Sequence, residues 1–234
     1  MGRKLFDTKY FAHIDLAKSH DACGIAICYV SRSVKVLRGI AEDQHYEVCP
    51  EIRTALLLRV VAPPNGEILV STVRGVLYKL NELGMEFGKI SYDSWGSHES
   101  IQILQSQGYE AEHLSVDTAT QPYATLKDAI YDGRLLCYYV PKLEEELLGL
   151  QYDAKRKKID HRPNGSKDLT DALAGAVYHC SLAEPPETAE AMMPSRGAVD
   201  TTEDIWERLP RGEPITRIHP FSAANIQPSL AMLS

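Results

Sequence analysis

Three aspartates that lie far apart in the chain could together form a metal-binding site. Asp15 lies within the apolar run Phe11–Leu16, where a charge needs a partner or a metal. Asp93 follows the strand-like run Gly88–Tyr92, and Asp171 lies inside a helical pattern. Clustered carboxylates repel one another, and one becomes protonated unless a cation holds them. Because oxygen ligands select hard ions, such a cluster predicts Mg²⁺ or Mn²⁺.

Taken singly, each aspartate also has an ordinary structural explanation. Asp15 could end its strand and cap the following turn, and Asp93 is a common kind of residue after a strand. Asp168 lies one helical turn before Asp171 and follows Ser166, a predicted helix N-cap. A carboxylate at that place favours the helix dipole without any further role. Only the fold can decide whether these side chains meet.

The helix predicted over residues 166–183 separates its side chains into two faces. At about 100° per residue, one face is apolar and holds Leu169, Leu173, Ala176, Val177 and Cys180. The other face holds Asp168, Asp171, Gly175 and Tyr178. That second face is compatible with solvent and equally with a metal site, so both interpretations stay open.

The elements that must position these acids follow a regular order. Apolar runs predict strands at 10–16, 24–30, 53–62, 67–70, 87–92 and 112–116. Helical spacing predicts helices at 71–83, 97–107, 122–131, 141–150 and 166–183, and a charged hairpin is expected at 152–159. Strands come first and then alternate with helices, which favours an α/β fold with a mixed sheet and helical cover.

The composition, 44% hydrophobic and 24% charged, is that of an ordinary soluble globular protein. No apolar run approaches the roughly 20 residues of a membrane helix, and the N-terminus lacks the apolar stretch of a signal peptide. The five cysteines form no CxxC pair, which indicates reduced core residues of a cytosolic protein rather than a zinc or disulfide framework.

Charge and proline content divide the chain into a domain and a tail. We expect one domain over 1–184 and an extended or disordered Pro-rich tail over 185–234, whose segment Asp204–Leu209 could dock a partner. Residues 184–234 hold eight acidic and four basic residues, so they contribute -4 to the net charge of -7. The remaining -3 argues modestly against tight autonomous binding of DNA.

An ordered series of motifs runs through residues 10–183. It comprises His13-Ile-Asp-Leu-Ala with Asp21-Ala-Cys-Gly-Ile-Ala, Arg59-Val-Val-Ala-Pro-Pro-Asn-Gly-Glu-Ile, Ile90-Ser-Tyr-Asp-Ser-Trp-Gly-Ser, His113-Leu-Ser-Val-Asp, and Lys158-Ile-Asp-His-Arg-Pro-Asn-Gly-Ser-Lys-Asp-Leu-Thr-Asp-Ala-Leu-Ala-Gly-Ala-Val. In this series the chain resembles the C-terminal nuclease domain of phage terminase large subunits. The resemblance implies an RNase H-like (RuvC-like) mixed five-stranded sheet flanked by helices.

The resemblance also implies roles for the acids. Asp15 would lie on the central strand and bridge two Mg²⁺ or Mn²⁺ ions. Asp93 would bind one ion from the end of the fourth strand, and Asp171 would bind the other from the last helix. Asp168 matches a position where related enzymes place a second acid or a histidine, so it joins the other three as a catalytic candidate.

Basic residues near these acids could contact DNA. In the family that the chain resembles, the hairpin lies beside the active-site groove, which implies backbone contacts from the run Lys155, Arg156, Lys157 and Lys158. His161 and Lys167 could approach the scissile phosphate or the metal. Solvated loop residues are an equally good interpretation of these two.

The function implied is a two-metal-ion endonuclease that cuts double-stranded DNA with low sequence specificity during phage genome packaging. No GxxxxGK[ST] phosphate loop occurs, so the chain would be a separately encoded nuclease, the product of a split or truncated gene, or an isolated domain. We expect an ATPase motor, a small terminase subunit and a portal protein as partners. The site of action would be the host cytoplasm, transiently at the procapsid portal. Two alternatives stay open: a RuvC-type Holliday junction resolvase, and a nuclease-inactive docking module.

Overall fold

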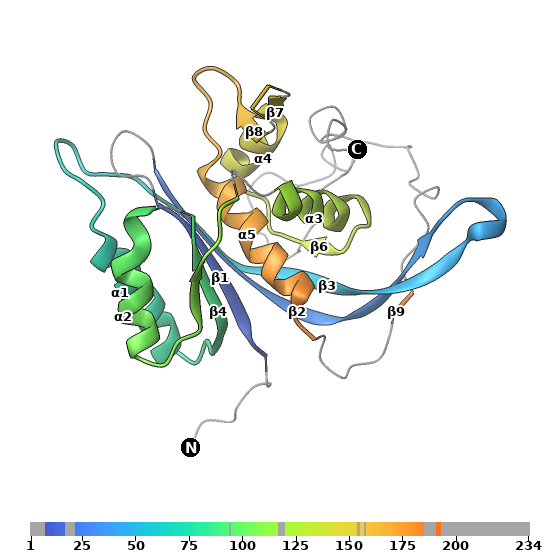
Figure 1. The fold of residues 1–234 in the computed structure, drawn as a ribbon, viewed down its shortest axis with the longest axis horizontal. Helices are drawn as coiled ribbons and strands as arrows, with labels where there is room; N and C mark the ends of the chain where they lie inside the picture. The colour runs from blue at the N-terminus through green and yellow to red at the C-terminus, as the bar shows by residue number, and fades with distance from the viewer. Residues whose placement is uncertain are drawn as a thin grey trace, which may run out of the picture.

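A mixed β-sheet forms the centre of the fold (Figure 1). The computed structural model describes residues 8–16, 22–93, 95–116, 120–153, 155–156, 158–184 and 191–192. The strands lie in the order β5-β4-β1-β2-β3-β6. Their bounds are β1 Tyr10–Asp15, β2 Cys23–Arg38, β3 His45–Val60, β4 Phe87–Tyr92, β5 Ala111–His113 and β6 Leu135–Leu136. Strands β1, β2 and β3 are antiparallel, whereas β4 and β5 run parallel to β1 and β6 runs parallel to β3.

Within the described part of the chain, five α-helices cover the two faces of this sheet (Figure 1). Helices α1 (Val70–Glu82) and α2 (His98–Ser106) pack on one face. Helices α3 (Thr120–Tyr131), α4 (Pro141–Gly149) and α5 (Asp168–Leu182) pack on the other. None of the described helices is both long and apolar enough to cross a bilayer.

Alternation along β1 decides which side chains face α5. Ala12 and Ile14 are buried in the core beneath α1 and α2. Successive side chains of a strand point to opposite faces, so His13 and Asp15 point toward α5. In the neighbouring β4, Ile90 lies in the same core as Ile14. The sheet therefore presents a polar row to a helix that carries acids of its own.

Two glycines allow α5 to approach the sheet closely. A β-carbon added to Gly24 on β2 would lie 1.9 Å from the carbonyl oxygen of Asp168. A β-carbon added to Gly175 on α5 would lie 2.2 Å from Cγ of His13. Neither position has room for a side chain. Because both residues are glycine, α5 lies directly against β1 and β2, with its first turn beside the end of β1.

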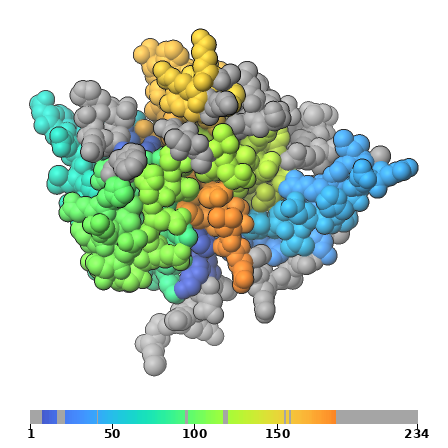
Figure 2. Space-filling model, viewed as in Figure 1, coloured from blue at the N-terminus to red at the C-terminus, as the bar shows by residue number. Residues whose placement is uncertain are grey.

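The β2–β3 hairpin projects from the body of the molecule (Figure 2). Near its tip, Arg38 donates two hydrogen bonds of 2.8 Å to the buried carboxylate of Asp132. Asp132 also accepts a hydrogen bond of 3.0 Å from Arg134. The ion pairs of Asp132 with Arg38 and Arg134 tie the hairpin to the turn between α3 and β6.

Two short 3-10 helices, Ala41–Asp43 and Trp95–Ser97, complete the described helical structure.

The structure confirms the mixed sheet and the predicted α/β order, with three differences. Strands β2 and β3 are longer than the strands predicted at 24–30 and 53–62, since β2 continues to Arg38 and β3 begins at His45. Residues 67–70 do not form a strand, because α1 already begins at Val70 and places Val73 and Leu77 in the core. Two short strands, β6 and β9 (Ala191–Met192), add to the five expected, and β9 pairs with β2 at Val34 and Lys35. The rest of the proposed 185–234 tail lies outside the described residues, so the division at 184 stays a prediction.

Candidate metal centre

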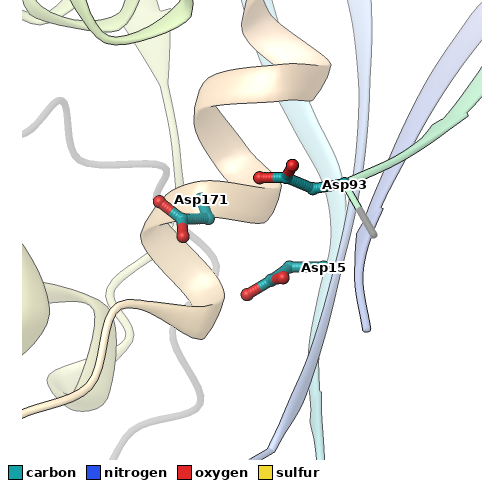
Figure 3. Close-up of side chains that lie close together, drawn as sticks. All are labelled: Asp15, Asp93 and Asp171. Atoms are coloured by element: carbon teal, nitrogen blue, oxygen red, sulfur yellow. The ribbon is translucent and has the colours of Figure 1, made fainter. Parts of the chain in front are cut away.

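Three carboxylates from distant parts of the chain meet at one end of the sheet. Asp15 ends β1, Asp93 follows β4, and Asp171 lies in the first turn of α5. One oxygen of each carboxylate lies within 4.8 Å of the others, and the three side chains lie close together (Figure 3). The structure thus brings together the three acids that the sequence proposed as metal ligands.

The parallel pairing of β1 and β4 places Asp93 beside Asp15. Ile14 lies opposite Tyr92 in the sheet, so Asp15 and Asp93, which follow them, lie at the same end of the sheet. The backbone N–H of Asp93 donates to the carbonyl oxygen of Ile14 at 3.1 Å, which extends this pairing by one residue. The carboxylate of Asp93 accepts a hydrogen bond of 3.0 Å from the backbone N–H of Val116. Both the backbone and the side chain of Asp93 are therefore held in place.

Asp171 is held by two side chains. It is 3% exposed. The hydroxyl of Tyr123 on α3 donates a hydrogen bond to Oδ1, and the ammonium group of Lys167 pairs with Oδ2. Sequence reasoning did not find Tyr123, because it lies 48 residues before Asp171 and nothing in the local pattern marks it.

Burial and neighbouring charge make Asp15 hard to ionise. Desolvation, followed by the negative charge of Asp171 and then that of Asp93, raises the pKa of Asp15 to about 8, although Lys167 acts in the opposite direction. At neutral pH the cluster therefore favours a bound proton or a bound cation. The ligand atoms are all carboxylate oxygens, which fits a hard divalent ion such as Mg²⁺ or Mn²⁺.

Asp168 lies next to the cluster but has a different partner. Its carboxylate pairs with Arg59 on β3 at 3.2 Å, and the residue is 6% exposed. With Asp168, Asp171 and Gly175 all buried, the solvated interpretation of this helix face is wrong. The face is covered because α5 packs against β1 through Gly175.

A glutamate from α4 caps the start of α5. Ser166 is not the N-cap; its hydroxyl instead donates to Glu146 Oε1 at 2.8 Å. Glu146 Oε2 accepts the backbone N–H groups of Leu169 and Thr170 at 2.9 and 3.0 Å. Glu146 is 1% exposed, and its burial raises its pKa. The helix end next to the acidic centre is therefore fixed by tertiary structure rather than by a local capping motif.

A buried chain of polar side chains lies between β1, β4 and α5. His13 Nδ1 and His179 Nε2 both lie 2.7 Å from the hydroxyl of Ser91. Burial lowers the pKa of His13 to about 3 and that of His179 to about 4, so both imidazoles are neutral at pH 7. One neutral imidazole can donate to the serine oxygen while the other accepts its O–H. These hydrogen bonds between His13, Ser91 and His179 fix α5 to the sheet.

The basic candidates occupy two different places. Lys155, Arg156, Lys158 and His161 belong to the hairpin of β7 (Leu150–Asp153) and β8 (Lys158–His161), whereas Lys157 lies outside the described residues. This hairpin lies at the end of the molecule where α5 begins (Figure 1). The Arg156 side chain is 69% exposed, and Lys158 pairs with Asp160 at 3.0 Å. Lys167 instead forms an ion pair with Asp171 in the acidic cluster. DNA contact by any of these basic residues stays a prediction.

Two solved structures with the same fold are large terminase nucleases of phages. The large terminase nuclease from thermophilic phage G20c matches with a TM-score of 0.53 and 18% identity, over 73% of this chain and 81% of that one. The large terminase nuclease domain of Thermus phage P74-26 matches with a TM-score of 0.51 and 17% identity, over 73% of this chain and 78% of that one. No protein-family model and no curated protein matched the sequence. The matches show that the chain has the fold of these nuclease domains, which confirms the RNase H-like sheet.

Proposed function

We propose that the chain is a metal-dependent endonuclease that cuts double-stranded DNA with low sequence specificity during phage genome packaging. The observation that carries the proposal is the convergence of Asp15, Asp93 and Asp171 at one end of the sheet. The fold shared with two large terminase nucleases supports it. A three-carboxylate centre on this fold is suited to phosphodiester hydrolysis, which needs no protein nucleophile.

The proposed ligand set is the three aspartates. Asp15 would be shared by two Mg²⁺ or Mn²⁺ ions, with Asp93 and Asp171 each holding one of them. Such ions activate water and neutralise the charge that develops on phosphate oxygens. The chain contributes the placement: Ile14 and Val116 hold Asp93, and Tyr123 holds Asp171.

The other site candidates would act around this centre. We assign Asp168 a position beside the ions, where its ion pair with Arg59 fixes both side chains. Lys155, Arg156, Lys157 and Lys158 would contact the DNA backbone from the β7–β8 hairpin, with His161 at its base.

Partners would supply what the acidic body lacks. With a net charge of -7, the chain offers little general attraction for DNA, so its grip must be local. We propose that an ATPase motor, a small terminase subunit and a portal protein hold the DNA and time the cut. The site of action would then be the host cytoplasm, at the procapsid portal during packaging.

Cleavage of supercoiled plasmid in Mn²⁺, Mg²⁺ or EDTA tests the proposal. We expect nicking and linearisation that require the metal and disappear in Asp15→Asn, Asp93→Asn and Asp171→Asn. The matched control is Asp128→Asn, an exposed aspartate on α3, which should cleave like the wild type. Cleavage retained in all three site variants would contradict the assignment. Preference for branched over linear DNA would indicate a junction resolvase instead.

A further inference from the structure

Lys167 places a positive charge inside the acidic centre. It immediately precedes α5, four residues before Asp171, and its ammonium group pairs with Asp171 Oδ2. The side chain is only 12% exposed, so solvent screens this pair weakly. The same ammonium group also acts on Asp15, whose pKa it lowers against the effects of burial and of the neighbouring acids. Lys167 therefore neutralises part of the charge that the three aspartates share.

The hydrogen bonds to Asp171 differ in what they allow. Tyr123 donates to Oδ1 and is neutral, so it can remain while the carboxylate binds an ion. Lys167 pairs with Oδ2 and carries a full charge, which repels any cation brought to the same oxygen. A divalent ion that uses Asp171 must therefore compete with Lys167 for this carboxylate.

We propose that Lys167 is a displaceable internal cation, which stabilises the metal-free centre and leaves Asp171 when a divalent ion binds. This inference rests on the proposed function, because it concerns the regulation of the same metal site. Its consequence is that Lys167 lowers the affinity for metal. The centre then takes up its ions only when they are plentiful, and the protein keeps a folded, partly neutralised site when they are not.

The test measures Mn²⁺ binding by calorimetry together with the thermal midpoint in EDTA. Lys167→Met keeps the length and the apolar stem of the side chain but removes the charge. We expect this variant to bind Mn²⁺ about tenfold more tightly, a change that corresponds to about 1.4 kcal/mol. Its thermal midpoint in EDTA should fall, because Asp171 loses the charged partner of a largely buried carboxylate.

Three further variants separate charge from damage to the structure. Lys167→Gln is also neutral but can still donate a hydrogen bond, so it should bind Mn²⁺ more tightly as well. Lys167→Arg keeps the charge and should bind like the wild type. Lys79→Met removes an exposed lysine of α1 that pairs with Glu82, and should change neither measurement.

The outcomes distinguish the inference from the function on which it rests. Unchanged or weaker Mn²⁺ binding in both neutral variants, with normal binding by the wild type, overturns the role of Lys167 alone. A merely structural role would give that result, since a disturbed site binds metal less well. No Mn²⁺ binding by the wild type overturns the metal centre and the Lys167 inference together.

Discussion

A β-carbon on Gly175 would lie 2.2 Å from Cγ of His13, so α5 crosses β1 at a distance that only glycine permits. Asp171 lies one helical turn before Gly175, on the same face of the helix. Asp15 lies two residues after His13, on the same face of the strand. The glycine contact therefore sets the separation between two of the three proposed metal ligands.

Gly175→Ala should loosen this crossing and weaken the metal centre. The His13 ring is fully buried and cannot move aside freely, so we expect a loss of about 1–3 kcal/mol in the free energy of unfolding, the usual range for overpacking. Mn²⁺ binding should weaken as well, because α5 carries Asp171. Urea unfolding and calorimetry measure the two effects. Gly75→Ala is the control: its added carbon meets nothing within 4 Å on α1, and it should stabilise by about 0.5–1 kcal/mol.

Asp15→Asn should stabilise the metal-free protein at neutral pH. The folded protein holds a proton on Asp15 up to a pKa of about 8, against an ordinary value of 3.8. The stability contributed by this group is therefore fully present below pH 3.8 and is lost as the pH rises toward 8. The variant removes that loss, so its thermal midpoint in EDTA should exceed that of the wild type at pH 8. Addition of Mn²⁺ should raise the midpoint of the wild type but leave the variant unchanged. Equal thermal midpoints of the variant and the wild type in EDTA would contradict the idea that burial and the neighbouring carboxylates disfavour an ionised Asp15.

The buried histidines should make the protein less stable in mild acid. Burial lowers the pKa of His179 from 6.5 to about 4; among the smaller effects, Glu112 raises this pKa and Lys89 lowers it further. Below pH 6.5 the unfolded chain gains a proton that the folded protein excludes, so stability falls as the pH decreases toward 4. The loss per titrating group is at most about 1.4 kcal/mol for each pH unit.

This slope is best measured in the Asp15→Asn protein, because Asp15 titrates with the opposite sign over the same range. Urea unfolding from pH 7 to pH 4 gives the slope, and His179→Gln should reduce it. His45→Gln, at an exposed histidine of the β2–β3 hairpin, should leave it unchanged. A slope that His179→Gln does not alter would show that this imidazole is not the group that titrates.

Tyr123→Phe should weaken metal binding by loosening Asp171. The variant removes the hydroxyl that donates to Oδ1 and keeps the ring in the core. Loss of such a supporting hydrogen bond lowers metal affinity by about 10–100-fold. Tyr138→Phe is the matched control, since it removes a hydroxyl bonded to the backbone of Leu57. The control should retain Mn²⁺ affinity in calorimetry, and equal losses in both variants would show a general effect on the core.

Glu146→Ala should destabilise the start of α5. It leaves the N–H groups of Leu169 and Thr170 without their acceptor, at a cost of about 1–3 kcal/mol in the free energy of unfolding. Glu146→Gln keeps an acceptor oxygen and should lose much less. Amide hydrogen exchange at Leu169 and Thr170 reports the local effect, and equal exchange in both variants would argue against the cap.

The sequence by itself determined the elements and most of the candidate ligands. Apolar runs and helical spacing fix local structure, because the burial period of a strand or helix is written in consecutive residues. Asp15 at the end of one run and Asp93 after another are therefore visible as residues at strand ends. Local patterns do not always distinguish a strand from a helix. The strand predicted at 67–70 was wrong, since a short apolar segment fits a strand or the approach to a helix equally well, and α1 begins at Val70.

Only the tertiary structure decided that the acids meet and what surrounds them. The parallel register of β1 and β4 puts Asp15 beside Asp93, and a glycine contact brings α5 to them. Partners such as Tyr123 and Glu146 come from other helices, so no spacing in the sequence marks them. The sequence left the polar face of α5 equally compatible with solvent and with a metal site, because a helical wheel shows which side chains share a face but not what covers it. Whether a carboxylate is a surface charge or a buried ligand depends on packing between distant segments, and that determines its chemistry.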